Sequence, residues 1–150
     1  MKKIMIERWN SIVTVNDEIY ILGDFLYKGT AKEANIILSK LNGKKYLIKG
    51  NHEKYLDIRS FKQEAFEWVK DYHVLKYKGF EFILFHFPIL LWHNSRLGSI
   101  HLYGHVHNKG IRNPVFEEKL KALGPKAFNV GVDVNNFYPV GINQIIAKFS

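Results

Sequence analysis

The stretch "KYLIKGNHE" (45–53) joins an apolar run to a glycine and then to a group of polar residues. Residues 45–49 have the composition of a buried strand, and Gly50 ends it. Asn51 and His52 are then expected at the carboxyl end of that strand. Ligands of layered α/β sheets bind at such strand ends. The stretch therefore predicts both an element of the fold and a site.

The same arrangement recurs at the ends of three other predicted strands. These strands are 18–22, the second strand of a hairpin that turns at Lys78-Gly79, and 99–103. The polar side chains that follow the four strands are Asp24, Asn51, His52, His86, His105 and His107. Each of them alone is more often a turn residue or a buried histidine than a ligand. Their joint order along the chain is a poor candidate for coincidence.

These side chains favour a metal site. A carboxylate, an amide oxygen and imidazoles together suit borderline divalent ions such as Mn, Fe or Zn. Glycine precedes the polar residue in three of the four sets, which would let the backbone turn sharply there. His105 and His107 are separated by one residue, so they could serve two neighbouring ions.

Helical signals lie between the predicted strands. Thr30 is expected to cap a helix over "TAKEANIILSKLNG" (30–43), with Glu33 three residues later and Gly43 as the stop. Further helices are expected over residues 60–71 and 115–123, and a final extended stretch over 127–134. The alternation predicts an α/β or α+β fold in a single domain, residues 1–150.

Composition limits the admissible functions. The chain has 150 residues and no cysteine, which excludes thiolate chemistry and disulfides and fits the cytoplasm. The longest apolar run, 82–92, falls short of the ~20 residues of a membrane span, so no membrane partner is expected. The net charge of +8 favours anionic partners, although a solvated basic face would give the same count. No recognisable nucleic-acid module accompanies it.

The ordered motifs Gly-Asp (23–24), Gly-Asn-His-Glu (50–53), His-x-Pro (86–88) and Gly-His-x-His (104–107) resemble those of the calcineurin-like metallophosphoesterases. The tail "NVGVDVNNFYPVGINQI" is similar to the closing strand and helix of the small bacterial and phage-type members, so the resemblance spans nearly the whole chain. It implies a two-sheet αββα sandwich with a dinuclear metal centre.

The resemblance also implies a role for each motif residue. Asp24 resembles the carboxylate that bridges both metals, and His107 resembles a ligand of the first metal. The residues that resemble the remaining ligands of the second metal are Asn51, His86 and His105. His52 resembles the histidine that assists the leaving oxygen. The implied cofactor is one or two divalent ions, with Mn, Fe and Zn favoured.

One motif of the family has no counterpart. Members begin with an Asp-x-His motif on the first strand, whereas the only aspartate before Asp24 is Asp17 and no histidine precedes His52. The chain is therefore expected to be N-terminally shortened and to lack the usual first strand of the sandwich. Such a loss would expose strand edges, which predicts a homo-oligomer; a monomer whose N-terminal residues fold over the gap is the alternative.

The expected function is metal-dependent hydrolysis of a phosphate mono- or diester by metal-activated hydroxide. Absence of the Asp-x-His motif could impair this activity. The substrate would be a small phosphate ester or a nucleotide. Two alternatives stay open: an inactive family relative that acts as a binding or scaffold module, and a basic nucleic-acid binder.

Overall fold

The computed structural model describes residues 2–106 and 114–149, and of Asp133 it describes the backbone only. The chain forms two compact units, residues 1–71 (unit 1) and 72–150 (unit 2), and each contains one sheet. The mixed α/β class predicted from the sequence is confirmed. The arrangement as an αββα sandwich, and the union of both units in one domain, stay predictions.

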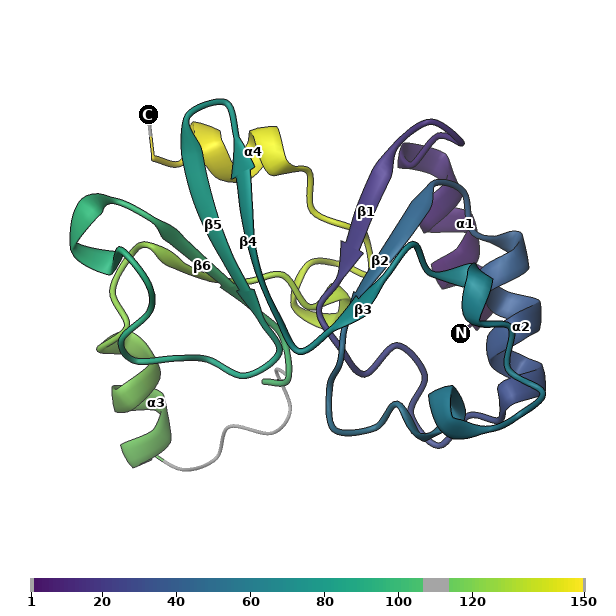
Figure 1. Cartoon of the computed structure of the whole chain (residues 1–150). Helices are drawn as coiled ribbons and strands as arrows, with labels where there is room; N and C mark the ends of the chain where they lie inside the picture. The colour runs from purple at the N-terminus through teal and green to yellow at the C-terminus, as the bar shows by residue number, and fades with distance from the viewer. Residues whose placement is uncertain (1, 107–113, 150) are drawn as a thin grey trace. The chain divides into compact units, whose positions relative to one another are not determined.

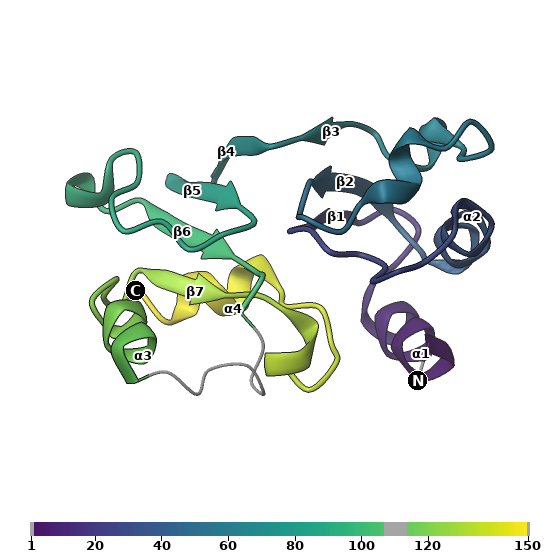
Figure 2. The same ribbon diagram turned by 90° about the horizontal axis from the view of Figure 1, so that it is seen from below.

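Unit 1 is built on a parallel three-stranded sheet in the order β1-β2-β3. Its elements are α1 (Lys2–Ile12), β1 (Glu18–Ile21), α2 (Ala31–Lys40), β2 (Lys44–Ile48) and β3 (Val69–Lys70). Both helices lie on the same side of this sheet (Figures 1 and 2). On that side Ala34 and Leu38 of α2 pack with Leu47 of β2 in the core of the unit.

The predicted cap of α2 is confirmed. The Thr30 hydroxyl accepts a hydrogen bond from the backbone N–H of Glu33 at 3.1 Å, which satisfies one of the amides that a helix start leaves without a partner. After the helix, Gly43 has φ +95°, a conformation that a side chain disfavours. Cap and stop together bring the chain from α2 directly into β2.

The predicted helix over 60–71 is wrong. The structure has a short 3-10 helix (Gln63–Ala65) and then β3. Strand pairing takes the place of helical bonds, because the Trp68 carbonyl accepts from the Leu47 N–H at 3.1 Å and the Glu67 N–H donates to the Lys45 carbonyl at 2.7 Å. Phe61 and Phe66 of this segment are buried without forming a helical face.

Unit 2 is built on a four-stranded sheet in the order β4-β5-β6-β7. Its elements are β4 (Tyr72–Tyr77), β5 (Phe80–Phe85), β6 (Ile100–Tyr103), α3 (Pro114–Lys121), β7 (Ala127–Asn129) and α4 (Ile142–Ala147). The β4–β5 hairpin is antiparallel, as predicted, and its turn residues Lys78 and Gly79 have φ of 49° and 79°. β5, β6 and β7 run parallel, so their carboxyl ends lie at one edge.

The C-terminal part of unit 2 is only partly extended. β7 covers three residues of the predicted stretch 127–134, and a 3-10 helix (Val132–Val134) follows it. α4 lies near the sheet, since Lys148 Nζ lies 4.1 Å from the ring centroid of Phe128 in β7. In the part of the chain that the structure describes, no helix is long and apolar enough to cross a membrane.

Candidate metal-binding residues

In unit 1, two loops leave the same edge of the sheet, because β1 and β2 are parallel. The first loop carries Asp24 and the second carries Asn51 and His52. Asp24 Oδ1 accepts a hydrogen bond from the backbone N–H of His52 at 2.9 Å, so the two loops are in direct contact. The structure therefore brings together the three unit 1 residues that the sequence singled out.

Asp24 has a backbone conformation that non-glycine residues seldom adopt. Its φ is 53°, and Gly23 before it has φ 88°. The sequence argument assigned sharp turns to the glycines that precede three of the four motifs, but Gly50 and Gly104 do not have positive φ. Left-handed non-glycine residues persist where surrounding contacts fix them, and they cluster at functional sites. At Asp24 the bond from His52 is one such contact.

Asn51 and His52 form a contiguous polar surface at the second loop. Asn51 Nδ2 lies 3.0 Å from His52 Nε2, so the imidazole accepts the amide hydrogen in this arrangement. The exposed Tyr27 ring meets the His52 ring edge-on, with the centroids 4.8 Å apart. Lys28 Nζ lies 5.3 Å from the centroid of Tyr27, which places a cation close to this surface. A histidine, an amide and a cation are groups that can contact a phosphate ester.

Glu53 is a site residue that the sequence analysis left without a role. Its side chain is buried, and its carboxylate accepts from the backbone N–H of Phe25 at 2.7 Å and from that of Gly50. Tyr55 is buried nearby, and its hydroxyl has no hydrogen-bond partner among the described residues. Burial, and then the charges of Glu53 and Asp24, raise the pKa of Tyr55 far above its usual range. That hydroxyl therefore stays protonated.

In unit 2, the ends of β5 and β6 bring two imidazoles together. His86 Nε2 lies 3.1 Å from His105 Nδ1, and the His86 side chain is fully buried. The Phe87 ring contacts both imidazoles, with centroid distances of 4.8 Å to His86 and 4.6 Å to His105. The His86 carbonyl accepts from the Gly104 N–H at 2.9 Å, which fixes the spacing of the two strand ends.

His105 is held in a tight turn. Its φ is 62°, and the Val106 N–H donates to the Gly104 carbonyl at 2.7 Å, which makes His105 the centre of a γ-turn. Such turns with positive φ are rare and strained. Asn129 at the end of β7 supports the turn, because its side-chain amide donates to the Val106 carbonyl at 2.8 Å. The sequence analysis gave no role to Asn129.

The spacing of the histidine nitrogens suits two ligands of one ion. Metal–nitrogen bonds of about 2.1 Å that meet at tetrahedral to octahedral angles place the two nitrogens about 3.0 to 3.4 Å apart. The observed 3.1 Å lies inside that range, and at this distance one ring donates a hydrogen bond to the other. The residues of unit 2 therefore fit a divalent ion, and neutral imidazole is the form that would bind it.

His101 is buried and hydrogen-bonded to the backbone. Its Nε2 accepts from the Ile89 N–H at 3.0 Å, and its Nδ1 lies 3.0 Å from the Ile83 carbonyl. These partners assign the proton to Nδ1 and define a neutral ring. Burial lowers the pKa of His101, against the opposing effect of its backbone hydrogen bonds.

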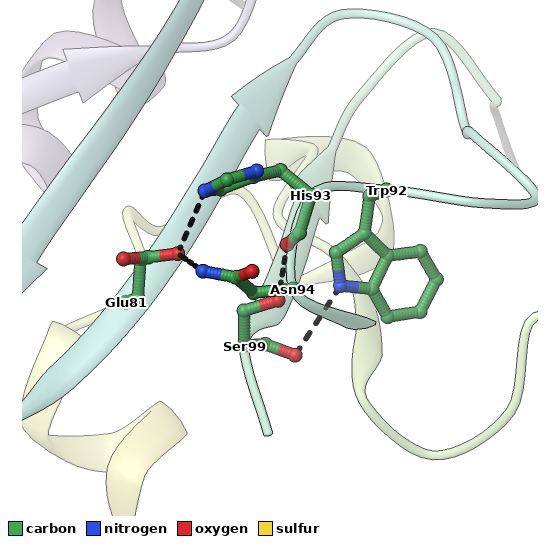
Figure 3. Close-up of polar contacts among 5 residues, drawn as sticks. All are labelled: Glu81, Trp92, His93, Asn94 and Ser99. Atoms are coloured by element: carbon green, nitrogen blue, oxygen red, sulfur yellow. Dashed lines mark hydrogen bonds and ion pairs between the residues drawn. The ribbon is translucent and has the colours of Figure 1, made fainter. Parts of the chain in front are cut away.

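His93 lies on the connection that follows His86, and its side chain contacts Glu81. Its Nε2 lies 3.6 Å from Glu81 Oε1, which also accepts from the Asn94 side chain at 2.9 Å. Figure 3 shows His93 and Asn94 directed toward Glu81. Glu81 is near the start of β5, whereas His86 follows its end, about 17 Å along an extended strand. His93 therefore does not accompany His86.

His107 lies outside the described residues. The remaining predicted ligands come from both units, Asp24 and Asn51 from unit 1 and His86 and His105 from unit 2.

No protein-family model matches the chain. The chain is 32% identical over 148 residues to the uncharacterized protein MJ1445 of Methanocaldococcus jannaschii, an alignment that covers 97% of this chain and 73% of that protein. The fold of this chain is similar to that in the crystal structure of AQ665, a protein of unknown function from Aquifex aeolicus. The TM-score is 0.72 at 23% identity, and the match covers 97% of this chain and 83% of the other. The chain belongs to the same protein family as MJ1445.

Proposed function

We propose that this protein is a metal-dependent phosphoesterase in which Asp24, Asn51, His86 and His105 bind a divalent ion. Manganese, iron and zinc are the favoured metals because the set combines oxygen and imidazole ligands. The observation that carries the proposal is the 3.1 Å approach of His86 Nε2 to His105 Nδ1 at the ends of parallel strands. The order of the motifs along the chain supports the same assignment.

In this proposal His52 assists the leaving group and Lys28 attracts the substrate. His52 is directed by its contact with Asn51 and by the Tyr27 ring, and in this proposal it donates a hydrogen bond to the departing oxygen. Such general-acid assistance contributes about 10² to 10⁴ in rate. Lys28 beside Tyr27 would attract the anionic substrate. A divalent ion, when bound, supplies Lewis-acid polarisation of the phosphate and lowers the pKa of a water.

Hydrolysis assays test this proposal. Wild-type protein should hydrolyse bis(p-nitrophenyl) phosphate or p-nitrophenyl phosphate when Mn²⁺ is added, and EDTA should abolish the reaction. His86→Ala should remove the activity, whereas His93→Ala, the matched histidine on the same connection, should retain it. Turnover that survives EDTA or His86→Ala would refute the proposal.

The alternatives predict different outcomes of the same assay. A binding or scaffold module would take up Mn²⁺ without turnover with either ester. A nucleic-acid binder would show steep salt dependence of binding without hydrolysis. Either result would replace the phosphoesterase assignment.

The expected homo-oligomer and the cytoplasmic location stay predictions. Sedimentation equilibrium at micromolar concentration addresses the first. A single species at the chain mass of 17.6 kDa would exclude self-association under those conditions.

A further inference from the structure

We infer that Glu53 is a positioning residue, whose buried carboxylate fixes the loop that carries Asp24 against the loop that carries Asn51 and His52. This inference rests on the proposed function, because it assigns the two loops to metal binding and catalysis. It adds a residue that makes no contact with the substrate and acts through the ligands.

The contacts of Glu53 place it between the two loops. One carboxylate oxygen accepts from the backbone N–H of Phe25 at 2.7 Å, and the other accepts from the backbone N–H of Gly50. Phe25 directly follows Asp24, and Gly50 directly precedes Asn51. One side chain therefore holds both loops next to the residues that are proposed to bind the ion.

A second contact runs between the same loops. The Asp24 carboxylate accepts from the backbone N–H of His52 at 2.9 Å. Each loop thus receives a carboxylate from the other: Glu53 reaches the first loop, and Asp24 reaches the second. The two contacts are reciprocal, so loss of the Glu53 carboxylate removes one of them and leaves the other in place.

The burial of Glu53 indicates that its hydrogen bonds matter to the structure. Its relative exposure is 5%, and a carboxylate removed from water is tolerated only where hydrogen bonds compensate it. The backbone amides of Phe25 and Gly50 provide such bonds, so the compensation depends on the conformation of the two loops. A glutamine would present an N–H to one of these donors, and an aspartate would be shorter by one carbon–carbon bond of about 1.5 Å.

Amide NMR on the ion-free protein tests the contacts. In Glu53→Gln, the amide resonances of Phe25, Gly50 and His52 should shift and their hydrogen exchange should accelerate. The exposed control Glu64→Gln, in the same unit, should leave all three unchanged. Unchanged resonances in Glu53→Gln would overturn the inference. If Glu53→Gln fails to fold by circular dichroism, Glu53→Asp takes its place with the same expectations.

Mn²⁺ titration calorimetry separates positioning from stability. Loss of a residue that orients metal ligands costs about 10- to 100-fold in metal affinity. Glu53→Gln should show a loss of that size, whereas Leu38→Ala, which lowers the melting temperature through the core of the same unit, should bind Mn²⁺ as tightly as the wild type. Equal affinity in Glu53→Gln and wild type would overturn the positioning role.

The two proposals fail in different ways. Absence of Mn²⁺ binding to the wild-type protein would refute the proposed function. The amide resonances of the ion-free protein would still decide whether Glu53 joins the loops. Shifted resonances would support that part of the inference, and unshifted ones would overturn it.

Discussion

His86 Nε2 and His105 Nδ1 lie 3.1 Å apart at the ends of β5 and β6. The His86 ring is fully buried, and His105 is the central residue of a γ-turn. The surrounding structure therefore fixes the position of both imidazoles. The pairing is local to unit 2 and depends on the parallel register of the two strands. Two nitrogens at this distance have the spacing of two ligands of one metal ion.

Replacement of His105 by glycine should relieve backbone strain but weaken Mn²⁺ binding. The φ of 62° at His105 costs about 1 to 2 kcal/mol for a residue with a Cβ atom. We expect His105→Gly to be about 1 kcal/mol more stable to urea than His105→Ala, after allowance for the backbone entropy of glycine. Both variants should lose most Mn²⁺ affinity, while His73→Ala on β4 should keep it. Equal stability of the two variants would contradict the strain.

Replacement of His52 should separate turnover from metal content. We expect His52→Ala to lower the rate of ester hydrolysis by about 10² to 10⁴, because the leaving oxygen loses its hydrogen-bond donor. Metal content by elemental analysis should stay at the wild-type level. A variant that loses its metal would identify His52 as a ligand instead.

The buried His101 makes stability depend on pH. Burial lowers its pKa in the folded protein, so the unfolded chain takes up the proton first as the pH falls. This contribution to stability is complete above about pH 6.5. It is lost as the pH falls from there through the lowered pKa of the folded state. We expect melting temperatures between pH 7.5 and 5 to fall less steeply in His101→Gln; parallel curves would contradict this role.

The Thr30 cap should be measurable by itself. Thr30→Ala removes the hydroxyl that accepts from the Glu33 N–H, and such losses cost about 1 kcal/mol. Thr30→Ser keeps the hydroxyl and should cost much less. Urea unfolding followed by circular dichroism compares the two. If serine costs as much as alanine, the hydroxyl does not stabilise α2.

Local signals made most of the fold predictable. The cap, spacing and stop of α2 are all within 14 residues, and the Lys78-Gly79 hairpin is fixed by its own turn. β3 was missed because its two residues become a strand only through pairing with β2, about 20 residues earlier. The apolar spacing of residues 61–69 also satisfies a helix, and sequence pattern alone does not separate the two outcomes.

The places of two candidate ligands in the fold were predictable from the strand ends. His86 directly follows β5, and Asp24 follows β1 after two residues. That they bind a metal stays a prediction. The role of Glu53 depends on the reach of its carboxylate to Phe25, 28 residues earlier, which no local pattern records. The partner of His93 was likewise not predictable, because Glu81 lies 12 residues earlier, near the start of β5.

The most direct test of the central claim is the metal content of three purified proteins after incubation with Mn²⁺ and removal of free ions. Wild-type protein should retain about one ion per chain, in line with the single set of ligands proposed from both units. Asp24→Ala in unit 1 and His86→Ala in unit 2 should each lose that same ion, while circular dichroism shows both variants folded. Retention of the ion by either folded variant would contradict a shared site.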